Sequence, residues 1–149
     1  MPLYCPKCKK WAYRNHKCSI LSLIPITRGM RGVADKLYSL LGNELLSASC
    51  FVYPVDGSIY EHTIIIDLEF RRQISTMLLG DFPTGWVWYT QTVTDDHLPL
   101  MVLGYSETYV WSGVFTIEDR VQQIIKEFEA HLDTRDIEAV RAIMLLSEY

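Results

Sequence analysis

Four metal-ligating side chains stand within the first 18 residues of the chain: Cys5, Cys8, His16 and Cys18. Thiolate sulfur and imidazole nitrogen are the ligands that tetrahedral zinc prefers, and a C-x2-C pair can present two sulfurs from one tight turn. Pro6 lies inside that pair and suits a turn because its ring fixes φ. The pattern predicts a zinc ion at the N-terminus. Iron in the same cage and cysteines that bind no metal are the alternatives.

The predicted site has four protein ligands and leaves no open position for a substrate. A closed shell is typical of structural zinc, which orders segments too short to bury a core of their own. The span from Cys5 to Cys18 equals that of the retroviral-type zinc knuckle, which the cluster resembles in part. In that family the histidine lies midway between the last two cysteines, whereas His16 precedes Cys18 by two residues. Water or a distant histidine could therefore replace one of these two ligands.

Basic and aromatic side chains stand between and beside the predicted ligands. Lysine and arginine pair with phosphates and aromatic rings stack on bases, which is the combination that a nucleic-acid strand requires. The candidate contact residues are Lys7, Lys9, Lys10, Trp11, Tyr13, Arg14 and Lys17. Two alternatives remain: the same surface binds a protein, or Trp11 and Tyr13 pack the knuckle onto the body while the lysines stay in solvent.

Charge is distributed unevenly along the chain. The net charge is −4, but residues 1–36 contain eight lysines and arginines against one aspartate, and the rest of the chain contains 6 basic and 17 acidic side chains. Such asymmetry predicts two surfaces with different partners, or two surfaces that attract each other. The alternatives are solvated charges that segregate by segment, and an acidic body that faces a basic protein groove normally filled by nucleic acid.

Composition and length indicate an ordinary globular protein. The chain has 149 residues, 49% of them hydrophobic and 21% charged, which is typical of one folded domain. There is no secretory-signal pattern, no apolar run is long enough to cross a bilayer, and Cys50 has no partner outside the metal cluster. We therefore expect a cytoplasmic protein with no membrane partner, and a core position for Cys50.

A second motif that could do chemistry is the segment 64–69, Ile-Ile-Ile-Asp-Leu-Glu. It resembles the first motif of the DEDD-type 3′–5′ exonucleases, in which Asp-x-Glu at the end of an apolar strand binds two metal ions. His131 and Asp136 have the spacing of that family's last motif. The resemblance implies metal ligation by Asp67, Glu69 and Asp136, with His131 as general base. The alternative is a strand with its acids toward water, and a histidine near a helix C-terminus.

The elements that must position these residues follow from the hydrophobic pattern. An amphipathic helix is expected over 28–46, interrupted near Gly42, and then strands over 49–53 and 58–70 with an Asp-Gly turn between them. A short helix over 71–79 and strands over 85–93, 98–105 and 109–115 come next. Two helices close the chain, the first capped by Thr116 with Asp119 three residues on.

The predicted fold class is α+β: a mainly antiparallel sheet of about four to five strands, one N-terminal helix and two C-terminal helices, plus a small N-terminal zinc knuckle. The knuckle is expected over residues 1–18 and a single domain over 19–149.

No phosphate loop, dinucleotide fingerprint, esterase motif or small-molecule site stands out. The sequence favours a non-enzymatic, zinc-stapled protein that binds nucleic acid or a nucleoprotein complex. It could be an accessory or inhibitory factor of a virus or mobile element in the host cytosol. The metal-dependent exonuclease is the alternative.

Overall fold

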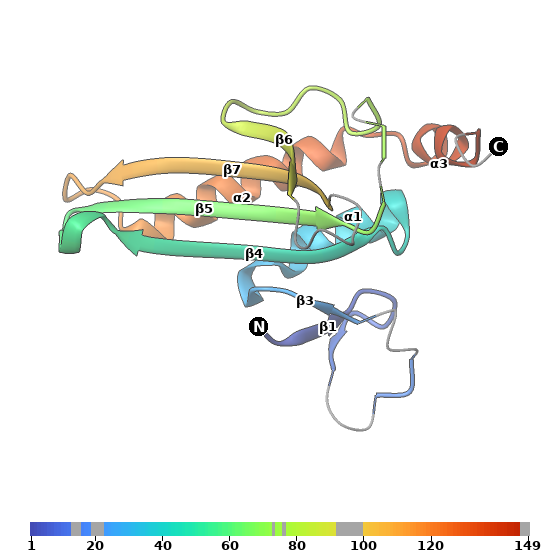
Figure 1. Ribbon diagram of the computed structural model, residues 1–149, viewed down its shortest axis with the longest axis horizontal. Helices are drawn as coiled ribbons and strands as arrows, with labels where there is room; N and C mark the ends of the chain where they lie inside the picture. The colour runs from blue at the N-terminus through green and yellow to red at the C-terminus, as the bar shows by residue number, and fades with distance from the viewer. Residues whose placement is uncertain (13–15, 19–22, 73, 76, 92–99, 147–149) are drawn as a thin grey trace.

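Two antiparallel sheets and the helices that accompany them make up the computed structural model, which describes residues 1–12, 16–18, 23–72, 74–75, 77–91 and 100–146 (Figure 1). A small sheet has the order β2-β1-β3, with β1 (Leu3–Cys5), β2 (Lys10–Trp11) and β3 (Ile24–Pro25). A large sheet has the order β4-β5-β7-β6, with β4 (Leu45–Pro54), β5 (Glu61–Phe70), β6 (Trp86–Gln91) and β7 (Leu100–Val110). The helices are η2 (Arg28–Met30), α1 (Arg31–Leu41), η3 (Val55–Gly57), α2 (Ile117–Asp133) and α3 (Ile137–Leu146).

The alternation of side chains along β5 decides which face of the large sheet is buried. Ile64, Ile66, Leu68 and Phe70 are fully buried, while the residues between them alternate to the opposite face. Figure 1 shows α1 and α2 behind the sheet, so the buried face is the one that the helices cover.

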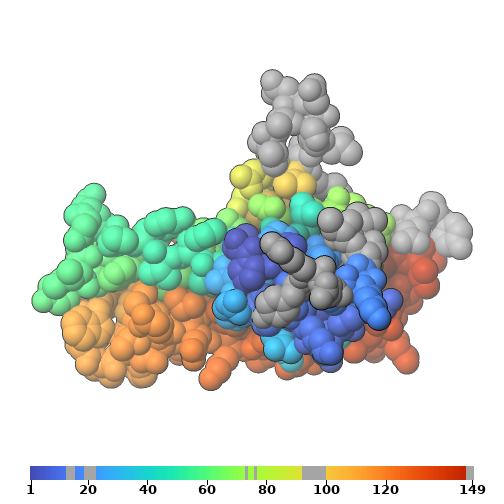
Figure 2. Space-filling view, turned by 90° about the horizontal axis from the view of Figure 1, so that it is seen from below, coloured from blue at the N-terminus to red at the C-terminus, as the bar shows by residue number. Residues whose placement is uncertain are grey.

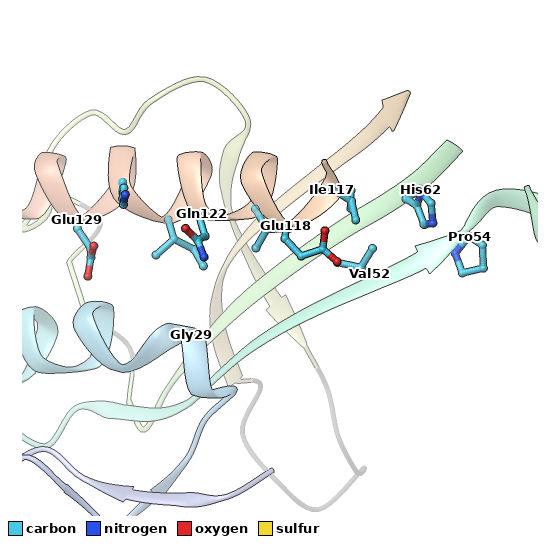
Figure 3. A pocket seen from close by; sticks show the side chains of 11 residues that line it. Gly29, Val52, Pro54, His62, Ile117, Glu118, Gln122 and Glu129 are labelled. Atoms are coloured by element: carbon cyan, nitrogen blue, oxygen red, sulfur yellow. The ribbon is translucent and has the colours of Figure 1, made fainter. Parts of the chain in front are cut away.

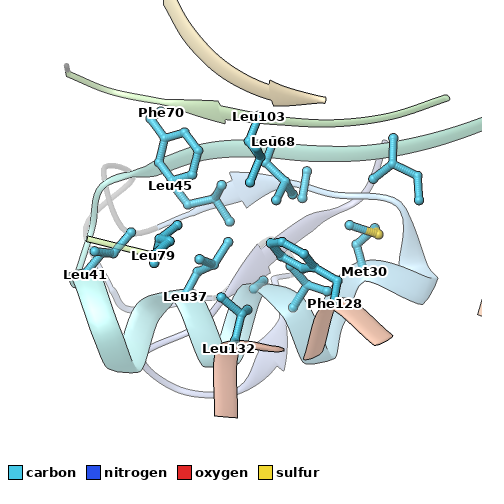
Figure 4. Close-up of a cluster of buried hydrophobic side chains, with 14 of the residues drawn as sticks. Met30, Leu37, Leu41, Leu45, Leu68, Phe70, Leu79, Leu103, Phe128 and Leu132 are labelled. Carbon is cyan, nitrogen blue, oxygen red and sulfur yellow. The ribbon is translucent and has the colours of Figure 1, made fainter. Parts of the chain in front are cut away.

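Side chains from the helices and the sheet meet in one core. Leu37 of α1 and Phe128 of α2 pack among Leu68, Phe70 and Leu103 of the sheet (Figure 4). Burying several large apolar side chains from distant segments is the main force that joins these elements. The predicted α+β class is confirmed, with a four-stranded antiparallel sheet and helices near their predicted places.

Local sequence explains where the helices begin and end. The helix α1 stops at Leu41 because Gly42 has a φ of 71°, a conformation that glycine adopts at little cost. The predicted helix over 28–46 is therefore too long, and its last residues open β4 instead. The predicted cap of α2 is present as a capping box: the Thr116 hydroxyl accepts from the Asp119 amide at 3.1 Å, and the Asp119 carboxylate accepts from the Thr116 amide at 3.1 Å.

Two predicted segments differ from the structure. Residues 100–110 form one strand where two were predicted, because the polar residues in the middle of β7 keep the alternation: Glu107 turns toward α2 and its neighbours turn away. In the segment 71–79 the described residues form turns and bends and no helix, with Ile74, Leu78 and Leu79 buried in the core. Residues 92–99, which include predicted strand ends, lie outside the described part of the chain.

The small sheet is attached to the free edge of β4. Ile26 forms a parallel bridge with Ala48, the Thr27 amide donates to the Ala48 carbonyl at 2.9 Å, and the Cys50 amide donates to the Thr27 hydroxyl at 3.0 Å. β1 pairs with β3, so strands from both sides of residue 18 share this sheet. The domain boundary at residue 18 stays a prediction.

None of the helices in the described ranges combines the length and the apolar character that a membrane span requires.

Candidate metal centre

A short hairpin brings the first two cysteines together. β1 and β2 pair with Cys5 opposite Lys10, and the residues between them form a turn that contains Cys8. Lys9 closes this turn in the left-handed conformation, with a φ of 56°. The chain therefore reverses within four residues and places both thiols at one end of the hairpin.

The four predicted ligands converge at that end. One ligand atom from each of Cys5, Cys8, His16 and Cys18 lies within 4.8 Å of all the others. Metal–ligand bonds of about 2.0–2.3 Å in a tetrahedron separate the ligand atoms by roughly 3.3–3.8 Å, so only small movements are needed to enclose an ion. The four cysteines of the chain are free thiols, and the sulfurs of Cys8 and Cys18 lie 3.2 Å apart, beyond the length of a disulfide bond, about 2.05 Å.

Burial supports metal binding at this cluster. Cys5 is fully buried, His16 and Cys18 are half-buried, and Cys8 is exposed. The Nε2 atom of His16 is buried and has no hydrogen-bond partner among the described residues. A buried imidazole nitrogen without a partner is unfavourable, and coordination to a metal ion would satisfy it. These residues lie close enough together to bind a metal ion, including His16 and Cys18, whose close spacing made joint ligation uncertain from sequence.

Residues of α1 hold the hairpin against the body. The Arg31 side chain donates from Nη2 to the Lys9 carbonyl at 2.8 Å and from Nε to the Tyr4 hydroxyl at 3.2 Å. Tyr4 is fully buried and donates to the Asp35 carboxylate at 2.6 Å. Burial, together with this hydrogen bond, raises the pKa of Tyr4 to about 12, so its hydroxyl stays a neutral donor at ordinary pH.

Trp11 also packs the hairpin onto the body. Its ring lies edge-on to Tyr4 at 5.0 Å between centroids, and the Arg28 guanidinium lies 5.2 Å from the Trp11 centroid. Sequence reasoning missed Tyr4, Arg28, Arg31 and Asp35, because their role depends on contacts between segments distant in the chain. The excess of basic residues in 1–36 was the available signal, although it did not single out these positions.

The predicted contact residues surround the metal cluster only in part. The side chains of Lys7, Lys9, Lys10 and Lys17 are exposed, whereas Trp11 is half-buried. Tyr13 and Arg14 lie outside the described residues. Arg28 adds an exposed positive charge that the prediction did not include. Figure 2 shows the N-terminal residues in blue on one face of the molecule.

The structure does not bring the exonuclease-like residues together. Asp67 and Glu69 lie on the face of β5 opposite the helices, where Asp67 accepts from the Tyr89 hydroxyl at 2.7 Å and Glu69 from the Ser47 hydroxyl at 3.0 Å. On the helix side, His131 Nε2 lies 2.6 Å from the Leu79 carbonyl.

Asp136 accepts from the amides of Glu138 and Ala139 at the start of α3. Throughout the described ranges, the Cys/His cluster is the sole group of three or more histidines, cysteines and acids placed to hold a metal ion.

Comparisons with known proteins return no match: no family model fits the chain, and neither a curated protein nor a solved structure is similar to it.

Proposed function

We propose that this protein is a non-enzymatic binding protein whose N-terminal hairpin is stabilised by zinc and contacts nucleic acid. The observation that supports a metal site is the convergence of four ligand atoms within 4.8 Å of one another. Three thiols and one imidazole suit zinc better than magnesium or calcium, which prefer oxygen ligands. Four protein ligands complete a tetrahedral shell, so zinc would order the hairpin and would not bind a substrate.

The exposed lysines around the cluster support nucleic acid as the partner. Lys7, Lys9 and Lys10 belong to the turn and to β2, whose backbone Arg31 and the paired strands fix in place. Lysines on an ordered turn can meet successive phosphates with little loss of backbone entropy. Trp11 is half-buried against Tyr4 and Arg28, which favours the lysines as the main contacts.

The wider role that we propose is that of an accessory or inhibitory factor acting on a nucleoprotein complex, such as a virus or mobile element encodes. Its small size and uneven charge favour this role. A reducing cytosol would keep the three thiolates available for zinc.

Metal content provides the first test. We expect one zinc per chain by inductively coupled plasma mass spectrometry, and loss of that zinc in Cys18→Ser. Cys50→Ser is the matched control, because Cys50 lies in β4 away from the cluster. A wild-type protein purified under reducing conditions that contains neither zinc nor iron, and takes up no added zinc, would contradict the metal site.

Nucleic-acid affinity as a function of salt provides the second test. Fluorescence anisotropy with labelled single-stranded DNA and RNA should show binding that weakens with salt, and Lys10→Ala should reduce the slope of log K against log salt by about 0.7–1. Lys126→Ala on α2 removes the same charge away from the hairpin and should leave the slope unchanged. Undetectable binding at low salt would exclude nucleic acid and leave a protein partner for this surface.

A degradation assay tests the exonuclease alternative. Wild-type protein should not degrade labelled single strands with Mn²⁺, and degradation that Asp67→Ala abolishes would replace our proposal with a nuclease.

A further inference from the structure

A groove lies between the end of the β4–β5 hairpin and the N-terminal half of α2. It has a volume of about 630 Å³ and is lined by residues from β4, β5, η2 and α2. Figure 2 shows a hollow between the green hairpin and the orange helix, and Figure 3 shows Val52, Pro54 and His62 on the strands opposite α2. The groove is separate from the metal cluster, since none of its lining residues is a predicted zinc ligand.

The wall formed by α2 has the surface of a helix–helix interface. Ile117, Val121 and Ile125 form one row of side chains spaced by four residues, and the second row is Glu118, Gln122 and Lys126. Rows at this spacing are the ridges between which a second helix packs. The apolar row borders the core, while the polar row forms the outer rim.

The helix α1 packs beside the C-terminal half of α2, where it takes the place of such a second helix. Its first residue lies short of the groove, so α1 does not extend into it. Glu129 fills the space that a Cβ at Gly32 would need, and Lys36 pairs with Asp133 at 2.6 Å. Successive residues of α1 therefore lie beside successive residues of α2, and the two helices run in the same direction. Before Gly32 the chain turns into η2, and Gly29 lines the end of the groove. The groove is thus the vacant continuation of the α1 position.

We propose that this groove binds an amphipathic α-helix of a partner protein, with an apolar stripe flanked by basic residues. Ile117, Val121 and Val52 would receive the stripe. Glu118 and Glu129 lie on the rim against one positive residue, Lys126, and the rest of the chain after residue 36 is acidic overall, so basic side chains fit best.

A helix fits better than an added strand. Thr27 donates to the Ala48 carbonyl and accepts from the Cys50 amide, so the even residues of β4 direct their backbone groups to the free edge. The next two such residues are Val52 and Pro54, and proline has no amide to donate. An added strand would gain a single donor there, whereas the groove offers apolar side chains along about 12 Å of α2, from Ile117 to Ile125.

The test selects partners from a phage-displayed library of random peptides of about 14 residues, or four helical turns. Wild-type protein should enrich peptides with leucine-like residues at helical spacing and flanking lysines or arginines. A selected peptide, synthesised and labelled, should become helical on binding, as measured by circular dichroism. Enrichment of extended peptides, or no enrichment above background, would overturn the proposal.

Matched variants then place the peptide in the groove. A Cβ at Gly29 meets no atom within 4 Å, so the backbone there can accept a side chain. Gly29→Phe adds a ring at the end of the groove and should weaken binding at least about tenfold, whereas Gly29→Ala should not. Glu118→Lys should also weaken binding, and Glu127→Lys, which does not line the groove, should leave it unchanged.

Equal binding by Gly29→Phe and Gly29→Ala would show that the peptide lies elsewhere. Sedimentation velocity adds the remaining outcome: a wild-type dimer that Gly29→Phe dissociates would make a second copy of this chain the occupant and overturn the proposal.

Discussion

At the scale of residues, Glu107 and Arg120 connect the large sheet to α2. Arg120 donates from Nε to one carboxylate oxygen of Glu107 at 2.7 Å and from Nη2 to the other at 2.5 Å, and the Tyr105 hydroxyl donates to the same carboxylate at 3.0 Å. The hydrogen bonds from Arg120 lower the pKa of Glu107 below its ordinary value of 4.5, because they favour the ionised form. A two-point contact of this kind fixes the angle of the helix on the sheet.

We predict that Glu107→Gln lowers the free energy of unfolding by about 1–3 kcal/mol at pH 7. The pKa of Glu107 is lowered in the folded state, so its contribution is present above pH 4.5 and is lost as the pH falls through the folded-state pKa. Urea unfolding at pH 7, 5 and 3 should therefore show a difference between wild type and variant that shrinks at pH 3. A difference that stays constant with pH would contradict the ion pair.

Gly104 leaves space for the Tyr89 ring on the face of the sheet opposite the helices. A Cβ there would lie 2.6 Å from the Tyr89 ring and 3.1 Å from the Asp67 carboxylate. Tyr89 crosses the glycine to donate its hydrogen bond to Asp67, and its pKa is raised by burial and by that bond.

We expect Gly104→Ala to reduce the free energy of unfolding by about 1–3 kcal/mol, because the methyl group displaces the tyrosine ring. The same substitution in a Tyr89→Ala background should have little effect, since the clash is absent. A double-mutant cycle from denaturant unfolding measures the coupling. Equal losses in both backgrounds would place the strain in the backbone of β7 instead.

At the scale of elements, α2 depends on its first turn. The capping box formed by Thr116 and Asp119 satisfies two backbone amides that would otherwise lack partners. The same turn carries Ile117 and Glu118 at the mouth of the groove.

Thr116→Ala should lower the free energy of unfolding by about 1 kcal/mol, because the cap to the Asp119 amide is lost. Ser112→Ala, in the exposed loop before the helix, is the control and should have little effect. Thermal unfolding followed by circular dichroism compares the two. If both variants unfold like the wild type, solvent replaces the cap and the capping box does not stabilise this helix.

Much of the element structure could be predicted, because it follows from local patterns. The apolar runs on either side of the Asp-Gly turn predicted the hairpin of β4 and β5, and the Thr116 signal located the start of α2. The length of β7 could not be predicted, since Glu107 looks like a strand break until Arg120 is placed beside it. The candidate metal ligands were predictable from type and spacing, whereas the hydrogen bond between Arg31 and Tyr4 required the three-dimensional contact.

At the scale of the whole molecule, the metal cluster and the main core are joined but distinct. Two of the four candidate ligands lie in the β1–β2 hairpin and two follow it, while most of the largest buried side chains bridge the helices and the large sheet. Tyr4 belongs to both, because it is buried in the core and lies next to Cys5.

We predict that a strong zinc chelator increases amide hydrogen exchange in β1, β2 and β3 but leaves β5 and β7 protected. The four candidate ligands lie in and beside the small sheet, so a bound metal would stabilise it, whereas the large sheet is held by the main core. Exchange followed by mass spectrometry, with and without chelator, measures this. A uniform rise across all strands would mean that the metal maintains the entire fold.

The position of β7 in the sheet affects how the chain folds while it is being synthesised. β7 lies between β5 and β6 although it is the last of the strands to be synthesised. At roughly 5–20 residues per second, about 1.5 to 6 s pass between the synthesis of Phe70 and that of Leu100. During that time β5 presents an unpaired edge and a row of isoleucines to other nascent chains. Asp67 and Glu69, which follow those isoleucines and flank Leu68, place charges that oppose pairing with a foreign strand until β7 arrives.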